Sequence, residues 1–331
     1  MTHRSVAEIR AFLRDASLGP MPARGWPDAR SPVDVVAAGD LPPADTALGA
    51  GWAVSALSTV GASPESPLPL DPPPVPVAIG DALPEGRDAV APREAVEIVF
   101  DIVSAVSWVG PFEAVRRRGG DARAGQTLLP AGAPVTRLRH AALVAASLAP
   151  VSPAAPSPRV QASTVAPPPA PVLDAAKVLF SNTNCDILVS ADPERDTTAL
   201  VASGASLVAS RLALRPGADT AVVVKDDRPI VVTPARFDAM AAIRMAILDG
   251  GVLSGHVGEP APLAGRVASA VGMTEIVLLR REHDRLKPIA TGDWTLAAVL
   301  AAESFLILPP ESEGLPDGSI VAATSLMGDD W

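Results

Sequence analysis

The sequence predicts a multi-domain chain that combines an α/β fold with β-rich parts, and three observations support this. Its 331 residues exceed the length at which a single hydrophobic core stops growing, so two or more domains are expected. Hydrophobic residues make up 48% and charged residues 19%, which is typical of chains that fold around cores. Strand patterns separated by turn residues are followed by alternating helix and strand patterns, and then by strand patterns again.

The first part of the chain reads as one helix followed by a small β-rich module. Val6, Ile9 and Phe12 or Leu13 recur at helical spacing behind a capping residue, Ser5, and Gly19-Pro20 closes the segment. Residues 32–76 are rich in Pro, Gly and Ser, and residues 76–129 alternate short apolar runs, such as 96–99, with turn signals. These patterns predict short strands joined by turns.

The second part reads as a compact α/β domain followed by a small, mostly β domain. Residues 138–148 are helical in pattern, and the prolines that follow place a domain boundary near residue 158. The α/β patterns are a helix at 173–180, a buried strand at 187–189, a hairpin at 221–232 and a helix at 237–247. The terminal patterns are strands at 275–279 and 305–308, a helix at 295–302 and a turn at 316–318.

Charge and cysteine content exclude several classes of partner. The formal net charge of −10 repels phosphate backbones and anionic membranes, so neither nucleic acid nor a membrane is an expected partner. The one cysteine, Cys185, excludes an internal disulfide and a thiolate metal cluster, and we expect it to be a buried apolar residue. The charged N-terminal helix is neither a signal peptide nor a membrane span. Cytoplasm is therefore the expected location.

One run of residues carries a specific resemblance. Residues 115–125 read Val-Arg-Arg-Arg-Gly-Gly-Asp-Ala-Arg-Ala-Gly, and Leu-Leu-Pro-Ala-Gly follows at 128–132. Three arginines alone would indicate a solvated basic turn. The longer run resembles the motif VRRRGEDIRAG followed by LLPAG, found in the MoeA/gephyrin family of molybdenum-cofactor biosynthesis proteins.

Four further segments resemble that family in its own order. Residues 43–54 are similar to PFDNSAMDGYAV, and residues 80–90 are similar to TGAPLPEGADAVV. Residues 212–217 are similar to LAIKPG, and residues 305–314 to the terminal GLLVLP…EG segment. The resemblance covers nearly the whole chain.

The resemblance implies an architecture and a quaternary state. The expected parts are an N-terminal linking domain (1–45 and 137–157), an inserted β-rich domain (46–136), a shortened three-layer molybdopterin-binding-like α/β domain (158–250) and a C-terminal β domain (251–331). A homodimer is also expected. In the family, the pterin lies between the α/β domain of one subunit and the N-terminal domains of the other.

The resemblance also implies a chemistry and a set of site residues. Family members take adenylylated molybdopterin and molybdate, cleave the adenylate with a divalent cation and release the cofactor, so Mg²⁺, molybdopterin and molybdate are expected. The matching catalytic residues are Asp45 and Asp121, and Asp45, Asp121 and Glu94 are the matching metal ligands. The matching cofactor-binding residues are Arg116, Arg117, Arg118, Arg123 and Arg215. For each aspartate the alternative is a turn residue that caps its own backbone.

Several family motifs are altered in this sequence. The second aspartate of the first motif is Ala50, and its Asn-Ser pair is Thr46-Ala47. The STGDE segment appears at 163–166 without its acid, and the SGGVSVGD loop is replaced by 190–194, which contains no glycine to bring the backbone close to a phosphate. The PGNP loop corresponds to 233–236, the second lysine of KPGKP is Ala218, and the region 159–187 is short, as if a first β-α portion were deleted.

These differences leave three hypotheses open. The chain is a working molybdotransferase, a non-catalytic paralogue that binds cofactor or a client molybdoenzyme, or a scaffold that uses its dimer surface. Missing loops and acids favour the second, whereas Asp45, Asp121 and the family match favour the first.

Overall fold

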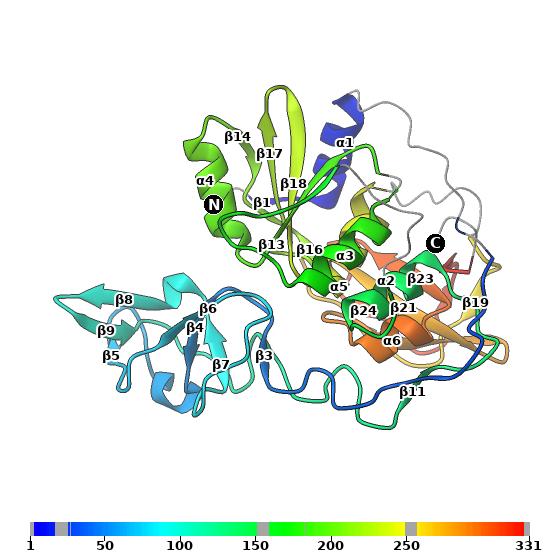
Figure 1. Ribbon diagram of the computed structural model, residues 1–331, viewed down its shortest axis with the longest axis horizontal. Coiled ribbons are helices and arrows are strands. Elements are labelled where there is room, and N and C mark those ends of the chain that lie inside the picture. The colour runs from blue at the N-terminus through cyan, green and yellow to red at the C-terminus, as the bar shows by residue number, and fades with distance from the viewer. Residues whose placement is uncertain are drawn as a thin grey trace. The chain divides into compact units, whose positions relative to one another are not determined.

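The computed structural model describes residues 3–16, 26, 28–150, 159–181, 183–248 and 257–327. The chain forms two compact units, residues 37–125 and residues 1–36 with 126–331. Both are rich in strands and the helices are few, which confirms the mixed α and β class (Figure 1). The expected boundary near residue 158 and the Gly19-Pro20 turn lie outside the described residues. The four domain ranges given above stay predictions.

The unit of residues 37–125 consists of short antiparallel strands, as its turn-rich sequence predicts. One sheet has the order β6 (Val75–Val77), β4 (Gly51–Val54), β7 (Ala89–Ala91), and another the order β5 (Leu68–Pro69), β9 (Ile102–Ala105), β8 (Val96–Val99). β3 (Thr46–Ala47) pairs with β10 (Val115–Arg116), and two 3-10 turns, η1 (Ala56–Thr59) and η2 (Arg93–Ala95), complete the unit. Its cores are built mainly from alanine and valine.

The small side chains let the strands of this unit approach closely. A Cβ atom at Gly51 would lie 2.2 Å from the carbonyl oxygen of Ala91 on the neighbouring strand β7. Gly51 is therefore required by strand packing.

The predicted α/β domain is a five-stranded sheet of order β12-β13-β18-β17-β14. Its strands are β12 (Val160–Ala162), β13 (Asp186–Ser190), β14 (Ser206–Ala209), β17 (Ala221–Lys225) and β18 (Arg228–Pro234). β12, β13 and β18 run parallel, so their carboxyl ends meet at one edge of the sheet. This confirms the strand predicted at 187–189 and the hairpin, whose turn contains Asp226 and Asp227 at positive φ.

Three helices pack on this sheet. α3 (Ala170–Leu179) contacts β12, α4 (Pro193–Ala202) contacts the strands from β13 to β14, and α5 (Phe237–Ile243) contacts β18 (Figure 1). α5 continues as a π-helix, η3 (Arg244–Leu248), so the predicted helix at 237–247 is confirmed. The interval 159–187, although short, contains a strand and helix, β12 and α3.

Two helices lie outside the sheet. α1 (Val6–Asp15) begins with the predicted cap, Ser5, which forms a capping box with Glu8, and it buries Val6, Ile9 and Leu13. α2 (Arg137–Ala145) begins at the N-cap Thr136 and packs against α3. Before α1, β1 (His3–Arg4) pairs with β15 (Arg211–Leu212), and β2 (Val35–Val36) pairs with β11 (Thr127–Leu129).

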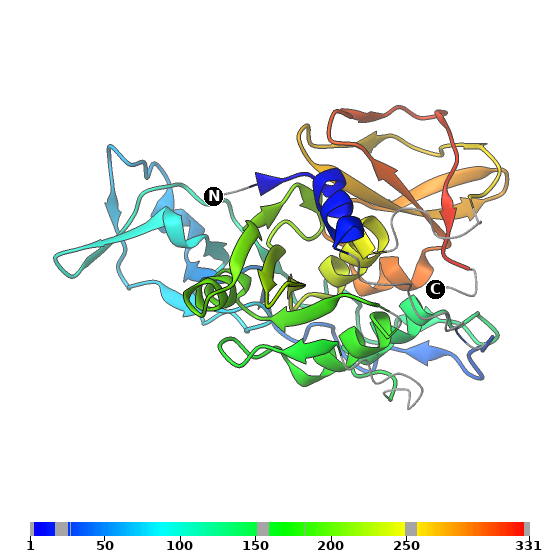
Figure 2. The same cartoon turned by 90° about the horizontal axis from the view of Figure 1, so that it is seen from above.

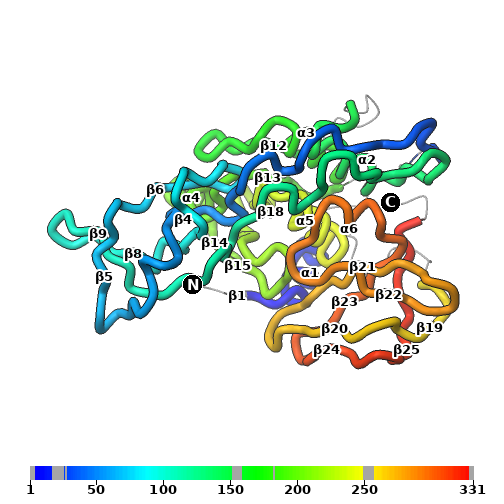
Figure 3. The backbone as a smooth tube through the Cα atoms, turned by 90° about the horizontal axis from the view of Figure 1, so that it is seen from below, coloured from blue at the N-terminus to red at the C-terminus, as the bar shows by residue number. Residues whose placement is uncertain are grey.

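The C-terminal part is mostly β, as predicted. Its main sheet contains β16 (Leu214–Arg215), β21 (Thr274–Glu282), β22 (Arg285–Ala290), β23 (Ser304–Leu308) and β26 (Thr324–Ser325). The pairs β19 (Ala261–Pro262) with β25 (Ile320–Val321), and β20 (Val267–Ala268) with β24 (Gly314–Leu315), lie beside it (Figure 3). Figure 2 shows these orange and red strands grouped together. α6 (Leu296–Ala301), capped by Thr295, confirms the helix predicted at 295–302.

Two other sequence expectations can be compared with the structure. Cys185 is fully buried, as expected, and burial raises the pKa of its thiol to about 12. No helix in the described ranges is both long and apolar enough to cross a membrane.

Candidate functional site: an exposed arginine turn

The family-like run folds into a turn that we call the arginine turn, residues 115–125. It begins on β10, where Val115 and Arg116 pair with Ala47 and Thr46. Gly119 has a φ of +66°, and the amide of Gly120 donates to the carbonyl of Arg117 at 2.8 Å. The left-handed backbone at position 119 favours glycine, which explains part of the motif.

The segment 40–45 holds this turn in place through backbone and carboxylate contacts. The amide of Asp121 donates to the carbonyl of Leu41 at 2.8 Å, and the amide of Arg118 donates to Asp45 Oδ1 at 2.7 Å. Asp40 accepts from the Ala124 amide through Oδ1 at 3.2 Å and from Arg118 Nε through Oδ2 at 2.8 Å. The turn is therefore fixed by residues about 80 positions earlier in the chain.

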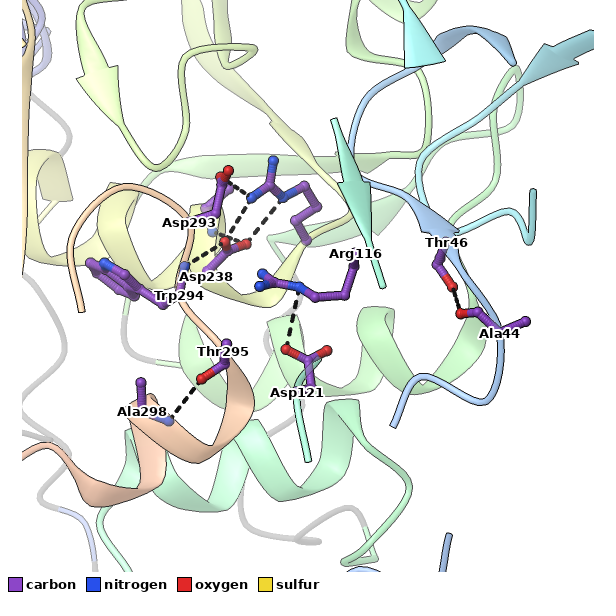
Figure 4. Close-up of polar contacts among 11 residues, drawn as sticks. Ala44, Thr46, Arg116, Asp121, Asp238, Asp293, Trp294, Thr295 and Ala298 are labelled. Atoms are coloured by element: carbon purple, nitrogen blue, oxygen red, sulfur yellow. Dashed lines mark hydrogen bonds and ion pairs between the residues drawn. The ribbon is translucent and has the colours of Figure 1, made fainter. Parts of the chain in front are cut away.

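The arginines of the turn differ in exposure. The side chain of Arg116 is mostly buried, and its Nε lies 3.4 Å from Asp121 Oδ1 (Figure 4). Arg117, Arg118 and Arg123 are exposed, and the guanidinium of Arg117 lies 4.0 Å above the ring of Phe112. The side chain of Arg118 is 68% exposed although it contacts Asp40. The side chains of Arg117, Arg118 and Arg123 are therefore exposed to solvent. The backbone that carries them is held by contacts with residues 40–45.

Asp40 provides a first test of this geometry. The pKa of Asp40 is lowered, first by the Ala124 amide and then by the hydrogen bond and charge of Arg118 and the charge of Arg123. A carboxyl whose folded pKa is lowered stabilises the fold above its unfolded pKa, and this contribution is lost as the pH falls through the folded pKa.

We therefore expect Arg118→Ala to raise the pKa of Asp40 without restoring its ordinary value, because the Ala124 amide remains. An NMR pH titration of the Asp40 carboxyl carbon measures this. Arg228→Ala, in the other unit, is the control and should leave the titration unchanged. An Asp40 titration that is identical in wild type and Arg118→Ala would contradict the observed contact.

The predicted metal ligands do not form a three-carboxylate cluster. Asp45 binds the Arg118 amide, Asp121 pairs with Arg116, and Glu94 is exposed in η2. Within the described ranges, no group of three or more His, Cys, Asp or Glu side chains is arranged to hold a metal ion. The donor set does not fit a complete Mg²⁺ site. The metal and catalytic roles of these acids stay predictions.

The carboxyl edge of the α/β sheet is filled by the protein's own side chains. Ser163 follows β12 and donates to Asp196 Oδ1 at 2.7 Å, and Ser190 at the end of β13 donates to Asp196 Oδ2. Asp196 lies in the first turn of α4 and is 3% exposed. Asp192 caps the same helix by accepting from the Arg195 amide at 3.2 Å.

This arrangement opposes phosphate binding at α4. A helix N-terminus attracts anions through its free amides and its dipole. Here two aspartates already lie at that end, and one of them accepts from its amides. A phosphate at this position would be repelled by the carboxylates.

The next loop on the same edge is also closed internally. Arg236, which follows β18, binds Asp238 through Nε at 3.1 Å and Nη2 at 2.7 Å, and it also pairs with Asp293. Asp238 is buried and accepts from the amide of Trp294 at 3.2 Å (Figure 4). Burial opposes the charge on Arg236, but the two carboxylates outweigh it and raise the pKa of Arg236.

The last predicted cofactor residue, Arg215, lies on β16. Its Nη1 is 3.1 Å from Oε1 of Glu275 on β21, and Glu275 is buried. The side chain of Arg215 is 44% exposed, and its charge is balanced by a buried carboxylate. Arg118 of the arginine turn pairs instead with Asp40, which is partly exposed.

Sequence reasoning missed Asp40, Asp196, Asp238 and Asp293. None lies in a segment that resembles a family motif. The available signal was acidic residues close to the altered motifs, at 192–196 and 238, but their partners are distant in sequence. The family motifs in the sequence did group Asp45 and Asp121 with the arginines at 116–123. All of these residues lie in the arginine turn or in contact with it.

The protein has mixed α and β structure and two compact units. The β-rich unit carries the arginine turn, which contacts with residues 40–45 hold in place. Residues 29–147 match the family model described as the MoeA N-terminal region (domain I and II). This match supports the membership of the MoeA family that the sequence predicts.

Solved structures similar to this chain include proteins from two Pyrococcus species. A molybdopterin biosynthesis MoeA protein from Pyrococcus horikosii has 18% identity and a TM-score of 0.38, with 98% of this chain and 99% of that chain covered. A molybdenum cofactor biosynthesis protein from Pyrococcus furiosus has 18% identity and a TM-score of 0.33, with 46% and 51% covered. No curated protein matches the chain. At these scores the family assignment depends on residues 29–147.

Proposed function

We propose that this chain is a MoeA-type protein of molybdenum-cofactor metabolism that binds a phosphorylated pterin through its arginine turn without completing the molybdate transfer. The observation that supports this most directly is the difference between two loop regions. The arginine turn exposes Arg117, Arg118 and Arg123. At the carboxyl edge of the α/β sheet, Asp196 and Asp238 already bind the groups that a ligand would contact.

The chemistry of the arginine turn suits a phosphate ester. Guanidinium groups are planar, grip phosphate oxygens in pairs and stay charged at physiological pH. Because Asp45 and Asp40 hold the backbone at Arg118 and Ala124, the turn needs little reorganisation before it binds. The adjacent carboxylate of Asp40 weakens the anion attraction, so binding should be modest and sensitive to salt.

The finer architecture and the partners belong to the same proposal. We propose an inserted β-rich module, a reduced molybdopterin-binding-type α/β domain and a C-terminal β domain, assembled as a homodimer that serves a molybdoenzyme client. Sedimentation velocity at micromolar concentration would show the dimer, and a monomer alone would count against it.

The binding role is tested by titration of the protein with molybdopterin. Arg118→Ala and Arg123→Ala should each weaken binding about tenfold or more, since a hydrogen bond to a charged group contributes roughly 1.5–3 kcal/mol. Arg215→Ala should have a smaller effect, because Arg215 is balanced by Glu275.

Arg87→Ala is the matched control within the same unit, since Arg87 binds the carbonyls of Pro72 and Pro73 and lies outside the turn. The proposal is wrong if Arg215→Ala abolishes binding while Arg118→Ala and Arg123→Ala leave it unchanged. In that case the surviving site contains β16.

A further inference from the structure

The unit that contains the C-terminal sheet has a cavity of about 570 Å³. Its lining residues belong to β11, α2, α6, β21, β22, β23 and β26 and to the loops beside them. Much of its wall is apolar and includes Leu128, Leu129, Leu286, Leu300 and Met327. This volume is in the range of sites that bind small organic molecules.

One buried cation lines the cavity, Arg139 of α2. This residue is only 7% exposed. Nη1 donates to the carbonyl of Pro134 at 3.0 Å and Nη2 to the carbonyl of Ala302 at 3.2 Å. Nε is buried and has no acceptor among the described residues. The two hydrogen bonds of the guanidinium end on neutral carbonyls, so the carboxylate of a ligand in the cavity would stabilise its charge.

The other charges of the cavity lie nearer to solvent or are already engaged. Arg281 and Glu259 are exposed, so water screens them. Arg280 pairs with Glu282 at 2.5 Å, and Glu303 accepts from the Arg281 amide at 3.0 Å. Burial lowers the pKa of Arg139 and the charge of Glu303 opposes this shift. Among the charged residues that line the cavity, Arg139 is therefore the one that is buried.

We propose that this cavity binds a small organic anion, an apolar body carrying one carboxylate that pairs with the guanidinium of Arg139. The apolar body would cover the leucine side chains and Met327, and the carboxylate would lie against the guanidinium. A neutral ligand of the same shape would supply an acceptor but no charge, and should bind more weakly because hydrogen bonds between charged groups are the stronger ones.

Isothermal titration calorimetry with 2-naphthoate and 2-naphthamide tests the charge requirement on the full chain. Both probes carry the same aromatic body, and only the first is an anion. Naphthoate should bind about tenfold more tightly than naphthamide, which is about 1.4 kcal/mol. Equal binding of the two probes, or binding of neither, overturns the proposal.

Matched substitutions on α6 test the location. Ala301 lines the cavity, whereas Ala297 lies on the same helix and does not. Ala301→Trp should fill the space and weaken naphthoate binding at least about tenfold, and Ala297→Trp should leave it unchanged. If the two variants bind alike, naphthoate is bound elsewhere and the proposal fails.

The role of Arg139 is tested by Arg139→Gln and Arg139→Lys. Glutamine should remove the preference for naphthoate over naphthamide, and lysine should keep part of it because its charge remains. Circular dichroism first checks that each variant is folded. If Arg139→Gln does not fold, the comparison of Ala301→Trp with Ala297→Trp still decides the matter.

Discussion

The purified protein is expected to convert adenylylated molybdopterin and molybdate to cofactor about ten-thousandfold more slowly than a complete family member, or not at all. One positioned group that stabilises charge in a transition state is commonly worth about a hundredfold or more. Here at least two such features are altered, since 163–166 lacks its acid and 190–194 lacks its glycines. The structure adds a reason for low activity. The serines at the ends of β12 and β13, Ser163 and Ser190, already donate hydrogen bonds to Asp196.

The measurement is product formation with saturating Mg²⁺ and molybdate, with a complete family member assayed beside it. An inactive preparation is distinguished from an inactive protein by the molybdopterin titration, which reports whether the arginine turn is folded and accessible. Turnover that depends on magnesium and approaches the rate of the complete enzyme would contradict the expectation.

The regular elements could be predicted because their signals are local. The spacing of Val6, Ile9 and Leu13 identifies α1, and a continuous apolar run identifies β13. Residues within such a pattern lie three or four positions apart on a helix, or alternate along a strand, so the pattern itself carries the structure.

The contacts that define the candidate site are not local, and the sequence could not show them. Asp40 meets Arg118 across 78 positions, and Asp196 meets Ser163 across 33. The family motif located the arginines but assigned Asp45 to catalysis or metal binding. In the structure Asp45 accepts a backbone amide, that of Arg118, 73 positions later. The expected alternative was an aspartate that caps its own backbone, whereas the amide that Asp45 binds belongs to Arg118. The catalytic and metal-binding roles of Asp45 stay predictions.

A large loss of folding stability is also expected when Asp238 is replaced. This buried carboxylate accepts from Nε and Nη2 of Arg236 and also from the amides of Ala239 and Trp294. Removal of one partner from a buried ion pair leaves an uncompensated charge and typically costs about 3–5 kcal/mol. Asp293 still contacts Arg236, but its side chain is 49% exposed, so it compensates only in part. We expect Asp238→Ala to destabilise the fold by about 3 kcal/mol.

The measurement is the midpoint of denaturant unfolding, with tryptophan fluorescence as the signal, since Trp294 is buried in the unit that contains α5. Asp174→Ala is the control, because its pair with Lys177 is about one-third exposed on both sides and should contribute less than about 1 kcal/mol. The stability of Asp238→Asn should lie between those of Asp238→Ala and Asp174→Ala, since asparagine keeps an acceptor for the amides but loses the charge.

A double variant separates the ion pair from simple loss of packing. Replacing both partners of a buried pair by apolar groups is often neutral, because no charge is then left unpaired. Arg236→Met combined with Asp238→Ala should therefore be more stable than Asp238→Ala alone. If the double variant is as unstable as the single one, the loss at position 238 comes from the amide hydrogen bonds to Ala239 and Trp294. The carboxyl edge would then be held closed by the backbone contacts of Asp238, and the charge of Arg236 would contribute little.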